Sequence, residues 1–133
     1  MQLTFSLLPE TYGIYQLSEN SPIPTPTTTG FWSFTRAQHE ATVVCPTGGC
    51  PYAASRSEGW GAIKLHGPFD FALTGIVAEV GRVLAAENIG VFVMSTFDTD
   101  YIFIKQFSMA AAVKALLAAG HLLSIAGEKA SDC

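Results

Sequence analysis

Two aspartates lie close together in the second half of the chain, at Asp98 and Asp100. They follow and precede runs rich in β-branched and aromatic residues, at residues 91–95 and 101–105. The polar residues 96–100 between these runs favour a turn, so the sequence predicts a β-hairpin. Two carboxylates at such a turn can bind a metal ion, accept hydrogen bonds from an ammonium group or face solvent. For Asp98 we favour the solvated turn.

A second group of chemical interest is the sequence Gly-Pro-Phe-Asp-Phe at residues 67–71. It leads into residues 71–87, whose apolar side chains recur on one face of a predicted helix. The start of a helix presents backbone N–H groups at its positive end, which suits a carboxylate. Gly67 would let a ligand approach the backbone closely, and Asp70 either caps the helix or accepts from an ammonium group. The plain cap is the simpler interpretation of Asp70.

The elements around these residues predict an α+β fold. A second helix is expected at residues 109–119, with Ser108 at its start and Gly120 at its end. Apolar-alternating strands are expected at residues 62–66 and 122–125, which gives the order β-α-β-β-α-β. This is the ferredoxin-like pattern, in which two helices cover one face of a four-stranded antiparallel sheet. The pattern alone does not define a function.

The first half of the chain predicts short strands and little helix. The strands are expected at residues 3–8, 13–17, 31–36 and 41–45. Residues 21–30 are rich in Pro and Thr and form a surface loop, either a plain connection or a lid over a pocket. Residues 46–59 form a second loop, taken as the boundary between the halves. We therefore expect a shortened, mostly β half at 1–58, a complete βαββαβ domain at 59–127 and a tail at 128–133.

Three segments resemble one protein family. Residues 60–76 (WGAIKLHGPFDFALTGI), 95–101 (STFDTDY) and 32–45 (WSFTRAQHEATVVC) are similar to the small ACT-domain proteins described as predicted amino-acid-binding proteins. The C-terminal half is also similar to the matching module of cytosolic arginine sensors of the mTOR pathway. The resemblance implies a tandem arrangement, with a shortened ACT-like half packed beside a complete ACT domain.

The same resemblance assigns roles to individual residues. It implies that the Asp100 carboxylate holds the α-amino group of a ligand, that Thr96 and Phe97 contribute backbone contacts, and that Ile76 forms a wall. On the other half, the backbone of Thr42 and Val43 would complete the pocket, which implies a ligand held between the two halves. The sequence departs from the family pattern at Ala37, where Thr is usual, and at residues 41–42, where Leu-Ser is usual. The candidate ligand-binding residues are Thr42, Val43, Gly67, Asp70, Phe71, Ile76, Thr96, Phe97 and Asp100.

Composition excludes several classes of function. The 133 residues carry a net charge of −4, so the basic clusters that bind nucleic acid or an anionic membrane are missing. No apolar run approaches the roughly 20 residues of a membrane helix, and we expect a cytoplasmic protein. No cofactor is expected, and no second Cys or His pair follows Cys45 and Cys50 at zinc spacing. We expect both, and Cys133, to be free thiols.

The sequence thus predicts a regulatory module without catalysis that binds a small amino acid or a related metabolite. One alternative is an assembly module that has lost the ligand, in which the Ala-rich helix at 109–119 forms a homodimer. The other is a small enzyme on the same fold, although common catalytic motifs are missing. A trio of Cys45, His39 and Glu40 is conceivable, but alternation along a strand disfavours it.

Overall fold

The computed structural model describes residues 1–66 and 75–124 of the chain. The chain divides into two compact units. The first combines Met1–Leu8 with Gly61–Cys133, and the second is Pro9–Trp60. The two units are described separately below. We expected residues 1–58 to group together, but the first strand of the chain belongs with the C-terminal part. Its partners there are the end of β5 and the last strand, β8.

The sheet of the first unit has five strands in the order β8-β1-β5-β7-β6. They are β1 (Thr4–Leu7), the last part of β5 (Ser55–Leu65), β6 (Val91–Ser95), β7 (Asp100–Lys105) and β8 (Leu122–Leu123). The expected four-stranded antiparallel sheet is therefore extended, because β1 lies between β8 and β5. It pairs antiparallel with β5 and parallel with β8. Leu3 and Phe5 explain this insertion, since both side chains are buried in the core under the helices.

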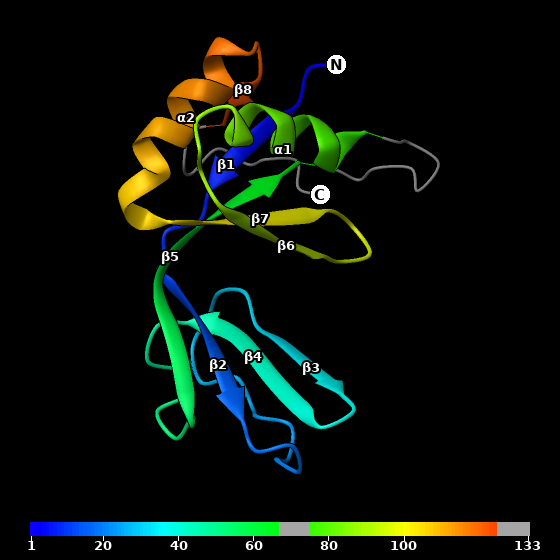
Figure 1. Ribbon diagram of the computed structural model, residues 1–133, viewed down its shortest axis with the longest axis vertical. Coiled ribbons are helices and arrows are strands. Elements are labelled where there is room, and N and C mark those ends of the chain that lie inside the picture. Colours follow the sequence, from blue (N-terminus) through cyan, green and yellow to red (C-terminus); the bar gives the residue numbers. More distant parts are fainter. Residues whose placement is uncertain (67–74, 125–133) are drawn as a thin grey trace. The chain divides into compact units, whose positions relative to one another are not determined.

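Two helices cover one face of this sheet, α1 (Ile76–Ala85) and α2 (Met109–Ala118) (Figure 1). Their apolar faces join Ile63, Leu65, Ile102 and Ile104 of the sheet in one core. A short 3-10 helix, η1 (Gln106–Ser108), precedes α2. The mixed α and β composition and this topology confirm the predicted ferredoxin-like fold.

The first helix begins later than the sequence predicted. We expected it to start at Phe71, but Gly75 has φ 86°, which no right-handed helix accommodates, and α1 starts at Ile76. Its first intrahelical bond runs from the Glu79 N–H to the Gly75 carbonyl, at 2.8 Å. The second helix matches its expected bounds to within one residue. Ser108 precedes it without a side-chain capping bond, and Gly120 follows it with φ 96°.

The second unit is a four-stranded antiparallel sheet in the order β3-β4-β2-β5. Its strands are β2 (Tyr12–Leu17), β3 (Ser33–Ala37), β4 (Glu40–Pro46) and the first part of β5 (Figure 1). One face carries the core of this unit, and most of that core comes from alternate residues of β2 and β4. The buried members are Tyr15, Leu17, Ala41, Val43, Cys45 and Cys50.

The strand β5 begins inside the segment that the sequence assigned to a loop. Residues 55–57 and Trp60 pair with β2, although residues 55–59 consist of Ser, Arg, Glu and Gly and lack the β-branched and aromatic types that favour strands. The pairing shifts between Tyr12, opposite Trp60, and Ile14, opposite Ser57, which marks a β-bulge. Gly59 has φ 85° at this bulge. The strand is only partly buried here, so it lacks the apolar alternation by which strands are recognised.

None of the helices in the described part of the chain is long and apolar enough to cross a membrane.

Candidate functional site

The tip of the β6–β7 hairpin is the most polar part of the predicted site that the structure describes. Ser95 ends β6 and lies opposite Asp100, the first residue of β7. The Ser95 hydroxyl donates to Oδ1 of Asp100 at 2.5 Å. Asp100 is half-buried, whereas Asp98 on the same turn is exposed. Asp98 is therefore exposed on the turn, as the sequence favoured, whereas the Asp100 carboxylate is bonded to a neighbouring hydroxyl.

The turn between these residues is closed by two threonines. The Thr96 N–H donates to the Thr99 carbonyl at 2.8 Å, and the Thr96 hydroxyl donates to the same oxygen at 3.1 Å. In return, the Thr99 N–H donates to the Thr96 hydroxyl oxygen at 3.3 Å. Hydroxyls that bond to nearby backbone in this way favour turns over extended strand. The backbone of Thr96 is thus held rigid, while Phe97 at the tip is 81% exposed.

Thr99 is a site residue that the sequence reasoning missed. It is only 4% exposed, and its hydroxyl donates to the Leu65 carbonyl at the end of β5 at 2.5 Å. Leu65 lies two residues before Gly67, so this bond fixes the hairpin tip against the strand that leads into the predicted carboxylate site. The sequence around Thr99 consists of polar residues typical of a turn, and this pattern did not indicate that the Thr99 side chain is buried.

The residues that lead into α1 are only partly within the described chain. Gly67, Asp70 and Phe71 fall in residues 67–74, outside the described residues. Ile76 is the first residue of α1 and is 8% exposed, with its side chain in the core of the first unit. Because α1 begins at Ile76, backbone N–H groups without an intrahelical acceptor are expected in its first turn.

Thr42 and Val43 are neighbours on β4, and their side chains lie on opposite faces of the second unit's sheet. Val43 is 1% exposed and joins the buried core. Thr42 is half-buried and lines an open hollow of about 320 Å³ on the other face. Gln16 pairs with both Thr42 and Ser55, so these three polar residues form one row across the strands that border this hollow. Because the side chains of Thr42 and Val43 point to opposite faces of the sheet, these two residues can contact the same ligand only through their backbone.

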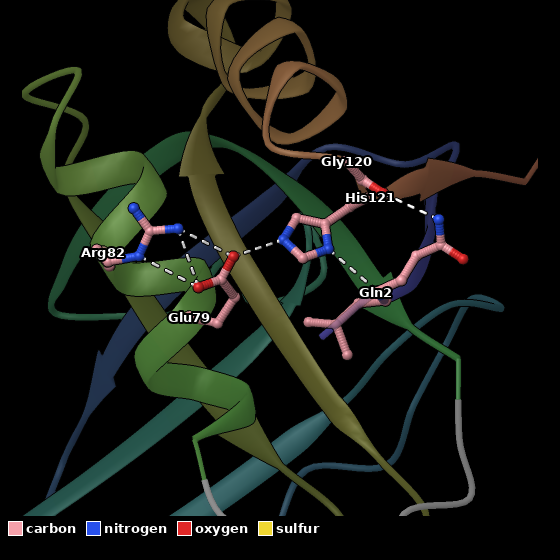
Figure 2. A network of polar contacts seen from close by, with 6 residues as sticks. Gln2, Glu79, Arg82, Gly120 and His121 are labelled. Carbon is pink, nitrogen blue, oxygen red and sulfur yellow. Dashed lines mark hydrogen bonds and ion pairs between the residues drawn. The ribbon is translucent and has the colours of Figure 1, made fainter.

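A polar network joins both helical segments to β1, as Figure 2 shows. The Glu79 carboxylate on α1 accepts three bonds from Arg82, and its Oε2 lies 2.8 Å from Nε2 of His121. The Leu3 N–H donates to Nδ1 of His121 at 3.0 Å. Nδ1 is therefore an acceptor, so the ring proton is on Nε2 and points to Glu79. No sequence pattern marks His121, because its partners Leu3 and Glu79 lie far from it in the chain.

His121 is 2% exposed, and its bonds fix its position between α1 and β1. The hydrogen bond from His121 and the Arg82 guanidinium lower the pKa of Glu79 below its ordinary value of 4.5. The Gln2 side chain adds a bond to the Gly120 carbonyl at 3.2 Å (Figure 2). The network positions the start of β1 and the end of α2, and none of its side chains is among the predicted ligand-binding residues.

The conceivable nucleophilic trio is not assembled. His39 lies in the β3–β4 turn with φ 65°, and its Nδ1 is 3.1 Å from Glu19. Cys45 is buried, and burial together with the neighbouring Cys50 and Glu58 raises the pKa of its thiol to about 12. Cys45 and Cys50 are both free, as the sequence predicted. Within residues 1–66 and 75–124, no three His, Cys, Asp or Glu side chains are grouped so that they could hold a metal ion.

Comparison with known families assigns the class of this fold. Residues 55–118 match the family model of the ACT domain, which covers β5 through α2. Residues 10–52 match a separate model of an N-terminal domain. The chain therefore combines a segment similar to the ACT domain with a segment similar to that N-terminal domain. No curated protein matches the sequence.

Solved structures place the chain in a particular family. A crystal structure of a protein from Agobacterium tumefaciens is 35% identical, with a TM-score of 0.85 and coverage of 93% of both chains. The chain belongs to the same family as that protein. A Vibrio cholerae protein of unknown function, described as a possible transport protein, is 18% identical with a TM-score of 0.67, over 88% of this chain and 89% of that one. The regulatory subunit of aspartate kinase from Thermus thermophilus is 8% identical with a TM-score of 0.57, over 87% and 96%. The latter two are similar in fold alone.

Proposed function

We propose that the protein is a regulatory module, without catalysis of its own, that binds a small amino acid or a related metabolite in the cytoplasm. The observation that carries this proposal is the ACT domain at residues 55–118. A regulatory subunit of an amino-acid pathway enzyme shares the fold. Because one fold can host several functions, the class of ligand depends on the chemistry of the site.

Asp100 is the proposed partner of the ligand's ammonium group. Its carboxylate is half-buried, and the Ser95 hydroxyl fixes Oδ1. Partial burial strengthens a charged hydrogen bond, because less water competes with the donor. Thr96 and Phe97 would add backbone contacts from a turn that is already rigid. These hydrogen bonds fix the hairpin tip, which would lower the entropic cost of binding on that side of the proposed site.

The ligand's carboxylate is proposed to meet backbone N–H groups between Gly67 and the first turn of α1. The positive end of the helix dipole and the N–H groups without intrahelical acceptors favour an anion there. Asp70, Phe71 and Ile76 complete this side of the proposed site. By resemblance to the family, the backbone of Thr42 and Val43 would close the pocket, so that the ligand is held between the two halves.

Replacing Asp100 tests this proposal. The Asp100→Ala variant should fold and lose at least tenfold in affinity for the ligand, because a charged hydrogen bond typically contributes about 1.5–3 kcal/mol. The matched control is Asp98→Ala, which removes the same charge from the same turn at an exposed position. The ligand is first found by a thermal-shift screen of the twenty amino acids, since a ligand at about 100 times its Kd adds roughly 2.7 kcal/mol of stability. Calorimetry then compares the variants.

Equal affinities of both variants would reject the role of Asp100. An assembly module is the second candidate, because several exposed side chains on and before α2 are apolar. Phe107 is 87% exposed and Leu117 is 45% exposed. A thermal midpoint that rises with protein concentration, and that no amino acid changes, would favour assembly over ligand binding.

A further inference from the structure

The second unit contains a pocket whose lining shares only Val43 with the proposed amino-acid site. It measures about 220 Å³ and lies between the sheet and the β2–β3 loop, residues 18–32. We refer to it as the loop cavity. Its lining residues are Ile23, Pro24, Pro26, Trp32, Ser33, Phe34 and Val43. The loop is the Pro/Thr stretch for which the sequence left a lid over a pocket as an alternative to a plain connection.

The loop above this cavity is held at two places. The Arg36 guanidinium donates to the carbonyl oxygens of Glu19 and Ser21 at the start of the loop. At the other end, Nε1 of Trp32 donates to the Thr28 carbonyl at 3.0 Å. Between these anchors, prolines at positions 22, 24 and 26 fix the backbone near φ −65° and lack N–H donors. The middle of the loop is therefore stiff and resists collapse onto the sheet.

The lining of the loop cavity is apolar. Val43, at 1% exposure, lies at its base, and Ile23, at 71% exposure, lies at its rim. The aromatic rings of Trp32 and Phe34 contribute further surface, and no charged residue is part of the lining. Ser33 is the polar exception, and alternation along β3 directs its side chain to the face opposite that of Phe34. Such a lining offers contact to a flat apolar molecule. The Arg36 guanidinium lies 5.2 Å from the centroid of the Phe34 ring, outside the lining, and donates to the carbonyl oxygens of Glu19 and Ser21.

The loop cavity is partly open to solvent, and its volume is large enough for one aromatic ring. An engineered apolar cavity of roughly 150 Å³ binds benzene. The loop cavity exceeds that volume and has aromatic walls, which prefer stacked or edge-on contact with another ring. An exposed Ile23 at the rim would also lose water contact when a guest is bound.

We propose that the loop cavity binds a small uncharged aromatic molecule, with the β2–β3 loop as its fixed cover. This site lies entirely within the second unit, whereas Asp100 belongs to the first. Its apolar lining also differs from the charged partners that an amino-acid site requires. The protein would then respond to two kinds of small molecule.

Methyl NMR with toluene as the probe tests this proposal. We expect saturable shifts of the Val43 and Ile23 methyl signals, whereas Val44 on the opposite face of β4 should not move. Ile23→Asp places a charge at the rim and should weaken toluene binding at least tenfold. Thr25→Asp is the matched control, because it adds the same charge to the loop at an exposed residue outside the lining, and it should bind as the parent does.

Three results would overturn the proposal. One is the absence of saturable methyl shifts up to the solubility limit of toluene. Another is an equal loss of toluene affinity in Ile23→Asp and Thr25→Asp, because the effect would then come from the added charge on the loop and not from a change in the lining of the loop cavity. The third is benzoate binding as tightly as toluene, since a charged ring contradicts an uncharged ligand class. Val43→Leu, which extends a side chain into the base, should weaken toluene binding and supplies a second variant if Ile23→Asp does not fold.

Discussion

At the hairpin tip, side chains of similar type have different roles because of small differences in position. Asp98 faces solvent, whereas Asp100, two residues later, is half-buried and bonded to Ser95. Thr96 closes the turn with its hydroxyl, whereas the hydroxyl of Thr99 is buried against Leu65. The structure therefore gives a physical reason to test Asp100 and to use Asp98 as the control.

Glu79 should make stability depend on acidic pH. Its folded-state pKa is lowered, first by the hydrogen bond from His121 and then by Arg82. A lowered pKa contributes stability above the unfolded value near 4.5, and this contribution is lost as pH falls through the folded pKa. The free energy of unfolding of the parent protein, measured with urea at a series of pH values from 6 downwards, should show this loss. In Glu79→Gln, this part of the pH dependence should be absent.

The control for this experiment is Glu87→Gln, which removes the same charge at an exposed position beyond α1. It should keep the acid dependence of the parent. If Glu79→Gln and the parent lose stability in parallel as pH falls, the His121 network does not contribute to acid sensitivity.

At the scale of elements, the sequence predicted the strands and helices that have a strong apolar periodicity. It missed a strand segment that forms only through pairing with its neighbour. The β6–β7 hairpin and α2 were predicted nearly to the residue, because alternation and helical spacing are strong there. The first part of β5 was taken as a loop, since its polar residues form strand through pairing with β2. The start of α1 was misplaced because the helical apolar pattern continues N-terminal to Gly75, whose positive φ interrupts it.

The same limit applies to the candidate site. Resemblance to a family could indicate Asp100 and Thr96, because their motif lies within one contiguous segment. It could not indicate Thr99 as an anchor or His121 as a bridge, since their partners Leu65 and Glu79 lie 34 and 42 residues away in sequence. Contacts across such separations depend on the fold, and no local pattern encodes them.

The strand β1 offers a matched pair for measuring how much it stabilises the first unit. Phe5 is 1% exposed and belongs to the core, whereas Leu7 on the same strand is 39% exposed. Phe5→Ala should lower the free energy of unfolding by about 3–5 kcal/mol, because it leaves a cavity in the core. Leu7→Ala should cost less than about 1 kcal/mol, as is usual away from the core. Similar losses in denaturant unfolding would contradict the inserted position of β1.

At the scale of the whole molecule, β5 is the element that both units share. It runs without interruption from Ser55 to Leu65, and the division between the units falls within it. Because β5 is a strand of the sheet in each unit, its unfolding in one unit would also remove a strand from the sheet of the other. We therefore expect the two units to unfold together, as small chains of this length usually do.

The Cys45 thiol can report on this coupling. It is buried in the second unit, and its pKa of about 12 keeps thiolate scarce at pH 8, so alkylation requires opening. In a Cys133→Ser, Cys50→Ser background, adding Phe5→Ala to the first unit should speed Cys45 alkylation by at least about 100-fold if opening is cooperative. Leu7→Ala should leave the rate nearly unchanged. An unaltered rate in the Phe5→Ala protein would mean that the units open independently.

The position of β1 also has a consequence for synthesis on the ribosome. The second unit is contiguous in sequence, so a nascent chain can complete it soon after residue 60 emerges. The first unit cannot be completed then, because Leu3 must wait for His121, 118 residues later. During that interval Leu3 and Phe5 lack their final core, and apolar strand residues without partners favour aggregation. Strand β1 is thus synthesised long before residue 121, so Leu3 and Phe5 can be contacted by chaperones and by other chains during that interval.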